Sequence, residues 1–561
     1  MRQTCQPLTD PEIWRGDFTS TQVNSRGGHH MKSVSDLRFG SIDAQDYLNN
    51  PDSPLSEFFK KSFYKSIHLE RAIHPDVYFL LGEKGTGKSA YAVYASHHMK
   101  PGFLADTVFF NRNDFTRFIE VASSLGVQTS QFSSLWVFVF SVLLIDRLQE
   151  SSDLPMNAEL DNFMNAVHRV TLGARVKSIS QSIEIADQVS SVFRHYAAVA
   201  KLELSASDID LAKPIFKINR LTDICINALT KLPDIRQFAI FLDGLDVRPD
   251  GVSYGDYLSV VSSVCNAVWD TNSKQLTGMS HQLKMVLLLR PDILETVPIQ
   301  NRGPKLMNHS HLVEWSTRYV HFQESEIFKF TDRVLSSQQS QDERLAEGDA
   351  WRKYFPFRIS SRVSKTGDDP FILFLRHSFY KPRDIVHYLT LMRDYYKNTG
   401  RGDSTSFEED VFKNLNIRKE HSDYIMLEIR DQLSFYYTDE EYQQFLDFAN
   451  GFLGKHIDKR NRVVGYDDFC IAHADYLQYN ERNNKTTVPS FSTADITLQF
   501  MFDLNVIGYY EEKTLRSGEK RVFTNYSFRQ RSFANLRPKV PTGSRYVMHY
   551  GVAKSLLVDF H

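Results

Sequence analysis

A glycine-rich segment limits, more than any other feature, what this chain can fold into. It reads GEKGTGKS from Gly82 to Ser89 and matches the pattern G-x-x-x-x-G-K-[ST] in full. The apolar run at residues 77–81 precedes it, and the helical pattern AYAVYASHH follows it. Glycines let the backbone turn so that successive N–H groups point at one phosphate, and the helix adds the positive end of its dipole. We interpret the segment as a phosphate-binding loop rather than a chance glycine-rich loop, because strand, loop and helix follow in the required order.

The residues of this loop have separate expected roles. Lys88 is expected to reach the β- and γ-phosphates of a nucleoside triphosphate, and the Ser89 hydroxyl to bind Mg²⁺. The other residues expected to contact nucleotide are Gly82, Glu83, Lys84, Gly85, Thr86, Gly87 and Ala90.

A second apolar run ends in carboxylates and supplies what such a site needs next. Residues 238–246 read FAIFLDGLD. Asp243 follows the run directly, so we expect it to bind Mg²⁺ through water from the side opposite Ser89. Asp246 is placed to orient an attacking water, and a loop or helix-capping aspartate is an equally good interpretation of it.

The pattern of apolar runs predicts the fold class. Five short runs read as buried strands, and long helical patterns separate most of them, which is typical of an α/β fold with a parallel sheet covered on both faces. Residues 114–234 are predicted to be helical insertions into this core. The predicted strands are residues 77–81, 107–110, 238–242, 285–289 and 312–315.

The 561 residues are enough for three or four folding units at roughly 150 residues each. We expect a loosely ordered segment at 1–50, an ATPase core at 51–320, a helical lid at 321–405, and a helical and winged-helix unit at 406–561. The 42% hydrophobic fraction excludes a disordered chain. The longest apolar run, 135–145, is shorter than the roughly 20 residues that span a membrane, so no membrane contact is expected.

The motifs GEKGTGKS and FLDGLD resemble those of P-loop ATPases of the AAA+ and STAND superclass, and the wording DGLD is similar to that of NACHT-type members. The resemblance covers residues 55–400 and implies ATP and Mg²⁺ as cofactors. It also implies that Arg290 belongs to a sensor-1 strand and that Arg383 is a sensor-2 arginine contacting nucleotide from the lid. The alternatives are a salt bridge at the end of a strand for Arg290 and an N-terminal helix charge for Arg383.

One residue departs from the family pattern. Many AAA+ proteins carry a glutamate directly after the Mg²⁺ aspartate, whereas this chain has Gly244. The catalytic base therefore stays open, which permits slow hydrolysis or a nucleotide switch. Arg302 and Lys305 are considered as an arginine finger, but an ordinary solvated loop is the favoured interpretation of both.

The C-terminal third resembles a winged helix in the order of its pattern. A helical segment at 493–502 precedes Gly508 and a hairpin predicted at 508–511 and 521–528. Residues 513–545 hold nine basic residues and one acidic residue, a local excess of +8 in a chain of net charge −2. This charge, with Tyr526, Phe528 and Phe533 interleaved, favours binding to DNA or RNA. The alternative is an aromatic wing core with basic residues that contact acidic parts of the same chain.

Two functions remain open from the sequence. The first is a Mg²⁺-dependent ATPase whose conformational or oligomeric switch acts on or near nucleic acid; resemblance to poorly characterised bacterial ATPases implies a place in anti-phage defence. The second is a regulatory scaffold whose nucleotide state controls homo-oligomerisation and a separate effector protein, without nucleic-acid binding. Four widely spaced cysteines and an N-terminus without a secretory pattern favour the cytoplasm.

Overall fold

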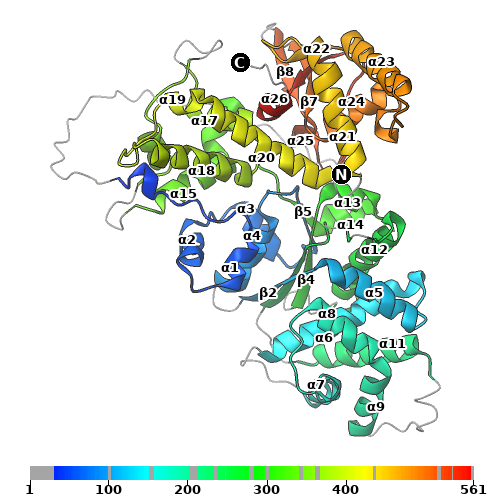
Figure 1. Cartoon of the computed structure of the whole chain (residues 1–561). Helices are drawn as coiled ribbons and strands as arrows, with labels where there is room; N and C mark the ends of the chain where they lie inside the picture. The colour runs from blue at the N-terminus through cyan, green and yellow to red at the C-terminus, as the bar shows by residue number, and fades with distance from the viewer. Residues whose placement is uncertain are drawn as a thin grey trace, which may run out of the picture.

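A computed structural model gives the structure of the protein (Figure 1). It describes residues 31–98, 103–150, 157–200, 212–232, 237–246, 248–249, 251–276, 283–298, 302–339, 345–360, 367–433, 438–514, 520–532 and 535–556.

The central element is a five-stranded sheet whose paired strands are all parallel, in the order β2-β3-β4-β1-β5. The fold class is therefore α/β, as predicted. The fifth strand was predicted at 312–315, but the strand spans Ser310–Leu312, and Trp315 beyond it donates to the carbonyl of Thr86 in the glycine-rich loop. The strands are β1 (Phe79–Leu81), β2 (Phe103–Phe109), β3 (Gln237–Asp243), β4 (Leu283–Leu289) and β5 (Ser310–Leu312).

Alternating side chains of the apolar strands enter two different cores. Along β3, Ile240 and Leu242 pack into one core, whereas Phe241 packs into the other. The first core contains α5 (Arg112–Ser124), α6 (Phe132–Glu150) and α12 (Tyr254–Asp270). The second contains α4 (Lys88–His98) and the helices of the lid. Because both faces are covered, the strands have no polar face, which explains their continuous apolar runs.

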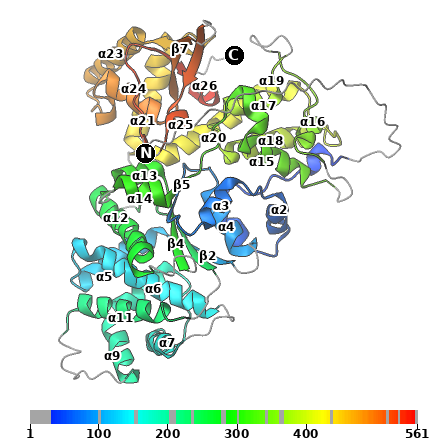
Figure 2. The ribbon, with the colours of Figure 1, turned by 180° about the vertical axis from the view of Figure 1, so that it is seen from behind.

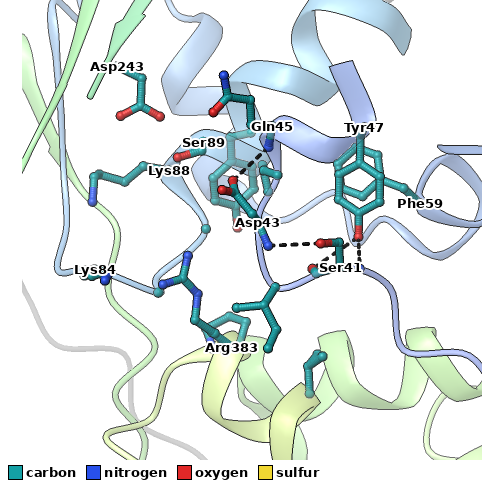
Figure 3. A pocket seen from close by; sticks show the side chains of 18 of the residues that line it. Ser41, Asp43, Gln45, Tyr47, Phe59, Lys84, Lys88, Ser89, Asp243 and Arg383 are labelled. Carbon is teal, nitrogen blue, oxygen red and sulfur yellow. Dashed lines mark hydrogen bonds between the residues drawn. The ribbon is translucent and has the colours of Figure 1, made fainter. Parts of the chain in front are cut away.

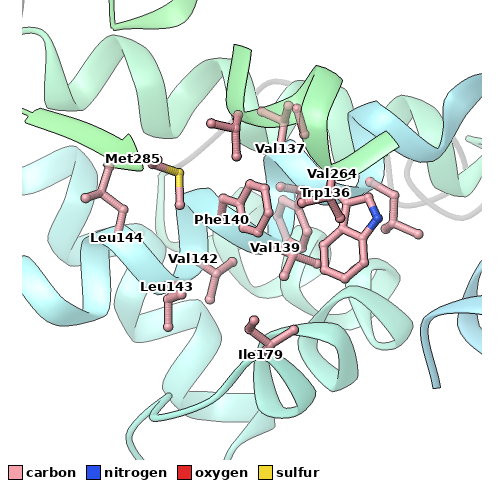
Figure 4. Packing of buried hydrophobic residues seen from close by; sticks show 14 of the residues in the cluster. Trp136, Val137, Val139, Phe140, Val142, Leu143, Leu144, Ile179, Val264 and Met285 are labelled. Carbon is pink, nitrogen blue, oxygen red and sulfur yellow. The ribbon is translucent and has the colours of Figure 1, made fainter. Parts of the chain in front are cut away.

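Helices fill the connection between β2 and β3, as predicted, and extend away from the sheet on the side opposite the lid (Figures 1 and 2). Residues 129–150 form the one described helix that is long and apolar enough to cross a membrane, and 78% of its apolar window is buried inside the protein. Trp136 and Phe140 of α6 pack among Ile179, Val264 and Met285 (Figure 4). The helix is thus the centre of a core. The other helices of this connection are α7 (Ala158–Val170), α8 (Ile179–Asp187), α9 (Val189–Val199) and α11 (Pro214–Leu229).

The described part of the N-terminal segment is packed rather than loosely ordered. Val34 and Leu37 are buried in the second core, and the Val34 amide donates to the carbonyl of Ser404 at 2.7 Å. The prediction missed this packing because the few apolar residues of the segment have no regular spacing. Residues 1–30 lie outside the described residues. The segment continues into α1 (Gln45–Asn49), α2 (Pro54–Ser62) and α3 (Ile67–Ile73).

The lid is helical and shares the second core with the sheet. Trp351 and Phe371 of the lid stack edge to face at 5.1 Å and are fully buried with Phe241 of β3 and Leu288 of β4. Its helices are α15 (Glu326–Ser336), α16 (Asp349–Tyr354), α17 (Pro370–His377) and α18 (Pro382–Asn398).

The residues from 415 to 556, which we call the C-terminal unit, have a core of their own. Helices surround a four-stranded sheet of order β6-β9-β7-β8 whose strand pairs are antiparallel. The predicted hairpin corresponds to β7 and β8, but the second strand ends at Asn525 and Phe528 lies in a short helix; β6 and β9 were not predicted. The strands are β6 (Val463–Gly465), β7 (Ile507–Thr514), β8 (Lys520–Asn525) and β9 (Arg545–Met548). The helices are α20 (Leu415–Leu433), α21 (Asp439–Phe448), α22 (Gly454–His456), α23 (Tyr466–Arg482), α24 (Ala494–Asp503), α25 (Ser527–Gln530) and α26 (Tyr550–Leu556).

Candidate functional site

The glycine-rich loop joins β1 to α4 at the carboxyl end of the sheet. Gly85 and Gly87 have φ angles of +85° and +92°, a region that L side chains rarely adopt. A Cβ on Gly82 would lie 3.2 Å from the carbonyl oxygen of Val313. The glycines therefore serve both the curvature of the loop and its close approach to the chain after β5.

Lys88 folds back into the loop that precedes it. Its Nζ donates to the carbonyl of Gly82 at 2.7 Å and to that of Glu83 at 3.1 Å. Burial lowers the pKa of Lys88, and the nearby charges of Asp246 and Asp243 oppose that change. The ammonium group is thus held inside the loop, where it can exchange carbonyl partners for phosphate oxygens.

The side chains of Ser89 and Asp243 lie within hydrogen-bond distance of each other. Asp243 is the last residue of β3, and its side chain accepts the Gly244 amide at 2.8 Å. Burial raises the pKa of Asp243, a hydrogen bond with Ser89 opposes the change, and the charge of Asp246 adds to it. Asp246 is half-buried and lines the same cavity. Two carboxylates and a hydroxyl gathered beside a buried lysine form the hard oxygen donor set that Mg²⁺ prefers.

The glycine that directly follows Asp243 has a steric reason to stand at position 244. Its φ is +94°, and a Cβ there would lie 2.6 Å from the carbonyl oxygen of Phe110. The Phe110 amide in turn donates to the carbonyl of Asp243 at 2.7 Å. Because Phe110, directly after β2, approaches position 244 so closely, a side chain there would clash with the backbone.

A cavity of about 560 Å³ opens beside the loop. Figure 3 shows Ser89 and Asp243 on one side of it, Tyr47 and Phe59 on the other, and Arg383 reaching toward it from the lid. The rings of Tyr47 and Phe59 stack at 4.1 Å. The cavity is lined by Lys84, Gly85, Gly87, Lys88, Ser89, Ala90, Asp243 and Arg383 among the predicted residues, and by Phe39, Phe58, Phe63, Tyr64 and Tyr91 on its aromatic side. It therefore combines a polar end suited to phosphates with an apolar end suited to a base.

Glu83 faces away from this cavity and holds the loop to two other parts of the chain. Its Oε2 lies 2.9 Å from Nζ of Lys381, which precedes α18 of the lid, and its Oε1 accepts from Arg531 of the C-terminal unit. Arg531 also donates to the carbonyl of Asp503 at 2.9 Å. Burial alone would raise the pKa of Glu83, but the charges of Arg531 and Lys381 lower it to about 2. The carboxylate is thus a charged junction of core, lid and C-terminal unit.

Two further cations at the loop contact α20. Lys84 forms ion pairs with Asp431 and, at 3.9 Å, with Glu428. Arg383 lies 3.4 Å from Glu428, and its backbone amide donates to the carbonyl of Gly85 at 3.5 Å. The predicted lid arginine therefore reaches the loop, and an α20 carboxylate holds it there.

Arg290 behaves differently from Arg383. It is 3% exposed, and its Nε donates to Asp292 at 3.1 Å, which is the strand-end salt bridge of the alternative interpretation. Its charge still lowers the pKa of both Lys88 and Glu83, because β4 lies between β1 and β3. The side chains of Arg302 and Lys305 lie outside the described residues.

Two neighbours of the loop were missed from the sequence. Trp315 donates from its indole nitrogen to the carbonyl of Thr86 at 2.9 Å and is buried, and the Thr86 hydroxyl donates to the carbonyl of Glu83 at 2.8 Å. Ser41 donates its amide to the Tyr47 hydroxyl at 2.7 Å and so shapes the aromatic side of the cavity. Trp315, the last residue of the run predicted as a strand at 312–315, was the available signal for the first contact.

The basic residues at 513–545 are largely engaged within the chain. Arg529 is half-buried, donates to the Tyr319 hydroxyl at 3.1 Å and lies 4.8 Å from the centre of the Tyr380 ring. Tyr526 is 6% exposed and stacks on Phe528 at 5.9 Å, so these rings belong to the core of the unit. In this part of residues 513–545, the aromatic side chains therefore form a core and the basic side chain contacts other parts of the same chain, which is the alternative to nucleic-acid binding given above.

The remaining basic residues are closer to solvent. Lys513 pairs with Glu511 at 3.1 Å, and Lys520 pairs with Glu512 at 2.8 Å on the β7–β8 hairpin. Arg537 lies 2.7 Å from Asp503, and the guanidinium of Arg545 lies over the Tyr510 ring. Arg516 and Phe533 lie outside the described residues, as does the side chain of Arg521.

Comparisons of this chain with protein-family models, with curated proteins and with solved structures find no match. The function must therefore be argued from the geometry of the site.

Proposed function

We propose that the protein binds MgATP at the glycine-rich loop and hydrolyses it slowly, as a nucleotide switch in the cytoplasm. One observation carries the proposal: Lys88, Ser89 and Asp243 converge on one cavity beside a loop whose glycines adopt positive φ. The chemistry of these three side chains fits a bound MgATP. The loop amides and Lys88 would hold the phosphates, and Ser89 and Asp243 would hold Mg²⁺, which neutralises charge on the phosphates when it is bound.

The residues around the cavity support a slow hydrolysis of ATP. Position 244 excludes a glutamate for steric reasons, so Asp246 is the carboxylate after β3 that can accept a proton from a water in the cavity. Arg383 enters from the lid, and its charge can stabilise phosphate oxygens. An aspartate two residues beyond the glycine is a less direct base than an adjacent glutamate.

The proposed nucleotide switch is based on the contacts of Glu83. Loop, lid and C-terminal unit meet at its carboxylate, so a rearrangement of the loop around a ligand changes the contacts of both other units. This favours the regulatory scaffold, in which the nucleotide state positions the C-terminal unit toward a further copy of the chain or an effector protein.

A second candidate function is action on nucleic acid. This function is still supported by Lys520 and Lys539, because both side chains are exposed on the C-terminal unit. Stimulation of ATP hydrolysis by DNA or RNA would favour this function, and hydrolysis that does not respond would favour the scaffold.

The test of the nucleotide site is a comparison of two lysines of one loop. Lys88→Ala should abolish tight ATP binding in calorimetry with Mg²⁺ present. Lys84→Ala should weaken ATP binding less than Lys88→Ala, because the side chain of Lys84 pairs with Asp431 and Glu428. Unchanged ATP affinity in a Lys88→Ala protein whose circular dichroism matches the wild type would refute the site.

A further inference from the structure

A second polar hollow lies on the outer side of the lid. We call it the basic hollow; it has a volume of about 310 Å³ and is lined by Lys32, Ser35, Asp36, Leu37, Arg38, Arg393 and Lys397. Four of these side chains are cationic and one is anionic. In a chain of net charge −2 this is a concentrated positive site.

Three of the four cations are available to a ligand. Within the part of the chain that the structure describes, Lys32, Arg38 and Lys397 have no side-chain ion pair or hydrogen bond. The single carboxylate, Asp36, accepts the Ser33 hydroxyl at 2.6 Å. This contrasts with residues 513–545, where Arg529, Arg531 and Arg537 contact groups of the same chain.

The backbone around the hollow is held in place. Gln338 accepts the Arg38 amide at 2.6 Å and donates to the Arg38 carbonyl at 2.8 Å. The Tyr354 hydroxyl donates to the carbonyl of Lys32 at 2.9 Å. Arg393 donates to the carbonyl of Leu37 at 3.2 Å and thereby joins α18 to this segment. The cations therefore project from a fixed frame, which lowers the entropy cost of binding.

Two elements run from the basic hollow to the nucleotide cavity. Helix α18 lines the cavity with Arg383 and Val386 and the hollow with Arg393 and Lys397. The fourteen residue steps from Arg383 to Lys397 correspond to about 21 Å of helix. The N-terminal segment lines the hollow up to Arg38 and the cavity from Phe39 onward, and the Arg393 guanidinium lies 5.6 Å from the centre of the Phe39 ring.

We propose that the basic hollow binds the phosphate groups of a polyanion, and that its occupancy changes nucleotide affinity at the cavity. Unpaired lysine and arginine side chains in an open, positively charged hollow suit phosphate oxygens, which a strand of nucleic acid or a free polyphosphate can supply. The coupling rests on the proposed nucleotide site, whereas the anion site does not. The two coupled sites share α18 and the segment at 31–47.

The test uses the full chain and two triple variants of equal charge change. Lys32→Glu, Arg38→Glu and Lys397→Glu together remove the cations of the hollow. Lys60→Glu, Arg460→Glu and Arg482→Glu together change exposed side chains elsewhere. Arg393 is left in place because it bonds the backbone. The probes are a fluorescent single-stranded oligothymidylate and inorganic tripolyphosphate, each titrated at low salt.

The hollow variant should bind the oligothymidylate at least about tenfold more weakly, and its salt slope should fall by about 2, since each phosphate contributes about 0.7 on a single strand. The control variant should match the wild type. Loss of tripolyphosphate binding alone would identify a free polyphosphate as the ligand. Tripolyphosphate can also enter the glycine-rich loop, so its affinities are compared between the two variants. No binding by the wild type, or equal loss in both variants, would overturn the site.

The coupling is measured as the affinity for ATP with and without saturating oligothymidylate, or tripolyphosphate if only that binds. A shift of at least about threefold is expected in the wild type and none in the hollow variant. If the protein binds the anion but does not bind ATP, the nucleotide site is refuted, whereas the anion site in the basic hollow is not. ATP binding that does not respond to the anion would refute the coupling alone.

Discussion

Arg531 of the C-terminal unit forms an ion pair with Glu83 inside the glycine-rich loop, across 448 positions of sequence. Both side chains are nearly buried, with 10% and 15% exposed, and Lys381 completes the group from the lid. Breaking such a pair leaves a charge without its partner in a region of low dielectric constant. The loop conformation and the position of the C-terminal unit are therefore linked.

The first prediction is that Arg531→Ala lowers the free energy of unfolding by about 3 kcal/mol. The reason is that Glu83 keeps only Lys381, and the carbonyl of Asp503 loses its donor. Chemical denaturation measures the change. Hydrogen exchange should also rise at the contact between the C-terminal unit and the loop.

The matched control is Arg537→Ala, which removes another arginine that contacts Asp503. Its side chain is 53% exposed, so the expected cost is about 0–1 kcal/mol. Equal costs for the two variants would mean that the Glu83 pair contributes no more than a surface ion pair.

The second prediction concerns the steric requirement at position 244. Gly244→Ala should cost about 3 kcal/mol or more, because the new Cβ would lie 2.6 Å from a backbone oxygen in addition to the strain of a positive φ. The distortion should also displace Asp243 and weaken Mg²⁺-dependent nucleotide binding. Denaturation and calorimetry measure the two effects.

The variant Gly251→Ala measures the cost of a positive φ without the steric clash that is expected at position 244. Gly251 has a φ of +81°, and a Cβ there meets no atom within 4 Å. That variant should cost only about 1 kcal/mol and leave nucleotide binding intact. A similar cost for both glycines would show that the contact with Phe110 relaxes without penalty.

The glycine-rich loop and the parallel sheet could be predicted from sequence because both depend on local order. A strand, a glycine pattern and a helix within residues 77–98 specify the loop, and apolar runs such as residues 285–289 specify buried strands. Asp243 was found for the same reason, since it directly follows a run of this kind.

The partners of the loop could not be predicted in this way. Nothing near Glu83 or Arg531 in sequence indicates that the two side chains meet, because only the packing of the C-terminal unit on the core brings them together. Phe39 and Tyr47 line the cavity from a segment whose apolar residues have no helical or strand period. The excess of basic residues at 513–545 was visible in sequence, but the contacts of Arg529 with Tyr319 and Tyr380 were not.

The third prediction is a pH dependence that originates at His421. This histidine is fully buried near His377, His387 and His549, and burial together with the charge of His387 lowers its pKa to about 3. The unfolded chain binds this proton below about pH 6.5 and the folded chain does not. The free energy of unfolding should therefore fall as the pH decreases from 6.5 toward 3, with His421 contributing about 1.4 kcal/mol per pH unit.

His421→Gln removes this titration and retains a donor toward the carbonyl of His377, which lies 3.1 Å from Nε2 of His421. Denaturation curves between pH 6.5 and 5 should show a smaller decrease for the variant than for the wild type. His74→Gln changes a half-exposed ring and should leave the dependence as it is. Parallel curves for wild type and His421→Gln would exclude His421 as the origin.

The fourth prediction distinguishes the two carboxylates after β3. Asp243→Asn should lose the dependence of nucleotide binding on Mg²⁺, because Asp243 faces Ser89 and its carboxylate is the expected ligand through water. Asp246→Asn should keep ATP affinity but slow hydrolysis by about 10²–10⁴-fold, as expected when a group that accepts a proton from water is lost. Calorimetry and a phosphate-release assay measure these effects.

Asp256→Asn is the control for the loss of one carboxylate nearby in the chain. Asp256 lies in the first turn of α12, which Ser253 caps, and its side chain accepts the Ser253 hydroxyl at 2.7 Å. Its substitution should change neither binding nor hydrolysis. If Asp246→Asn hydrolyses ATP as fast as the wild type, Asp246 does not orient water. Because a side chain at position 244 would clash with the Phe110 backbone, the group that orients water would then have to be a residue other than those at positions 244 and 246.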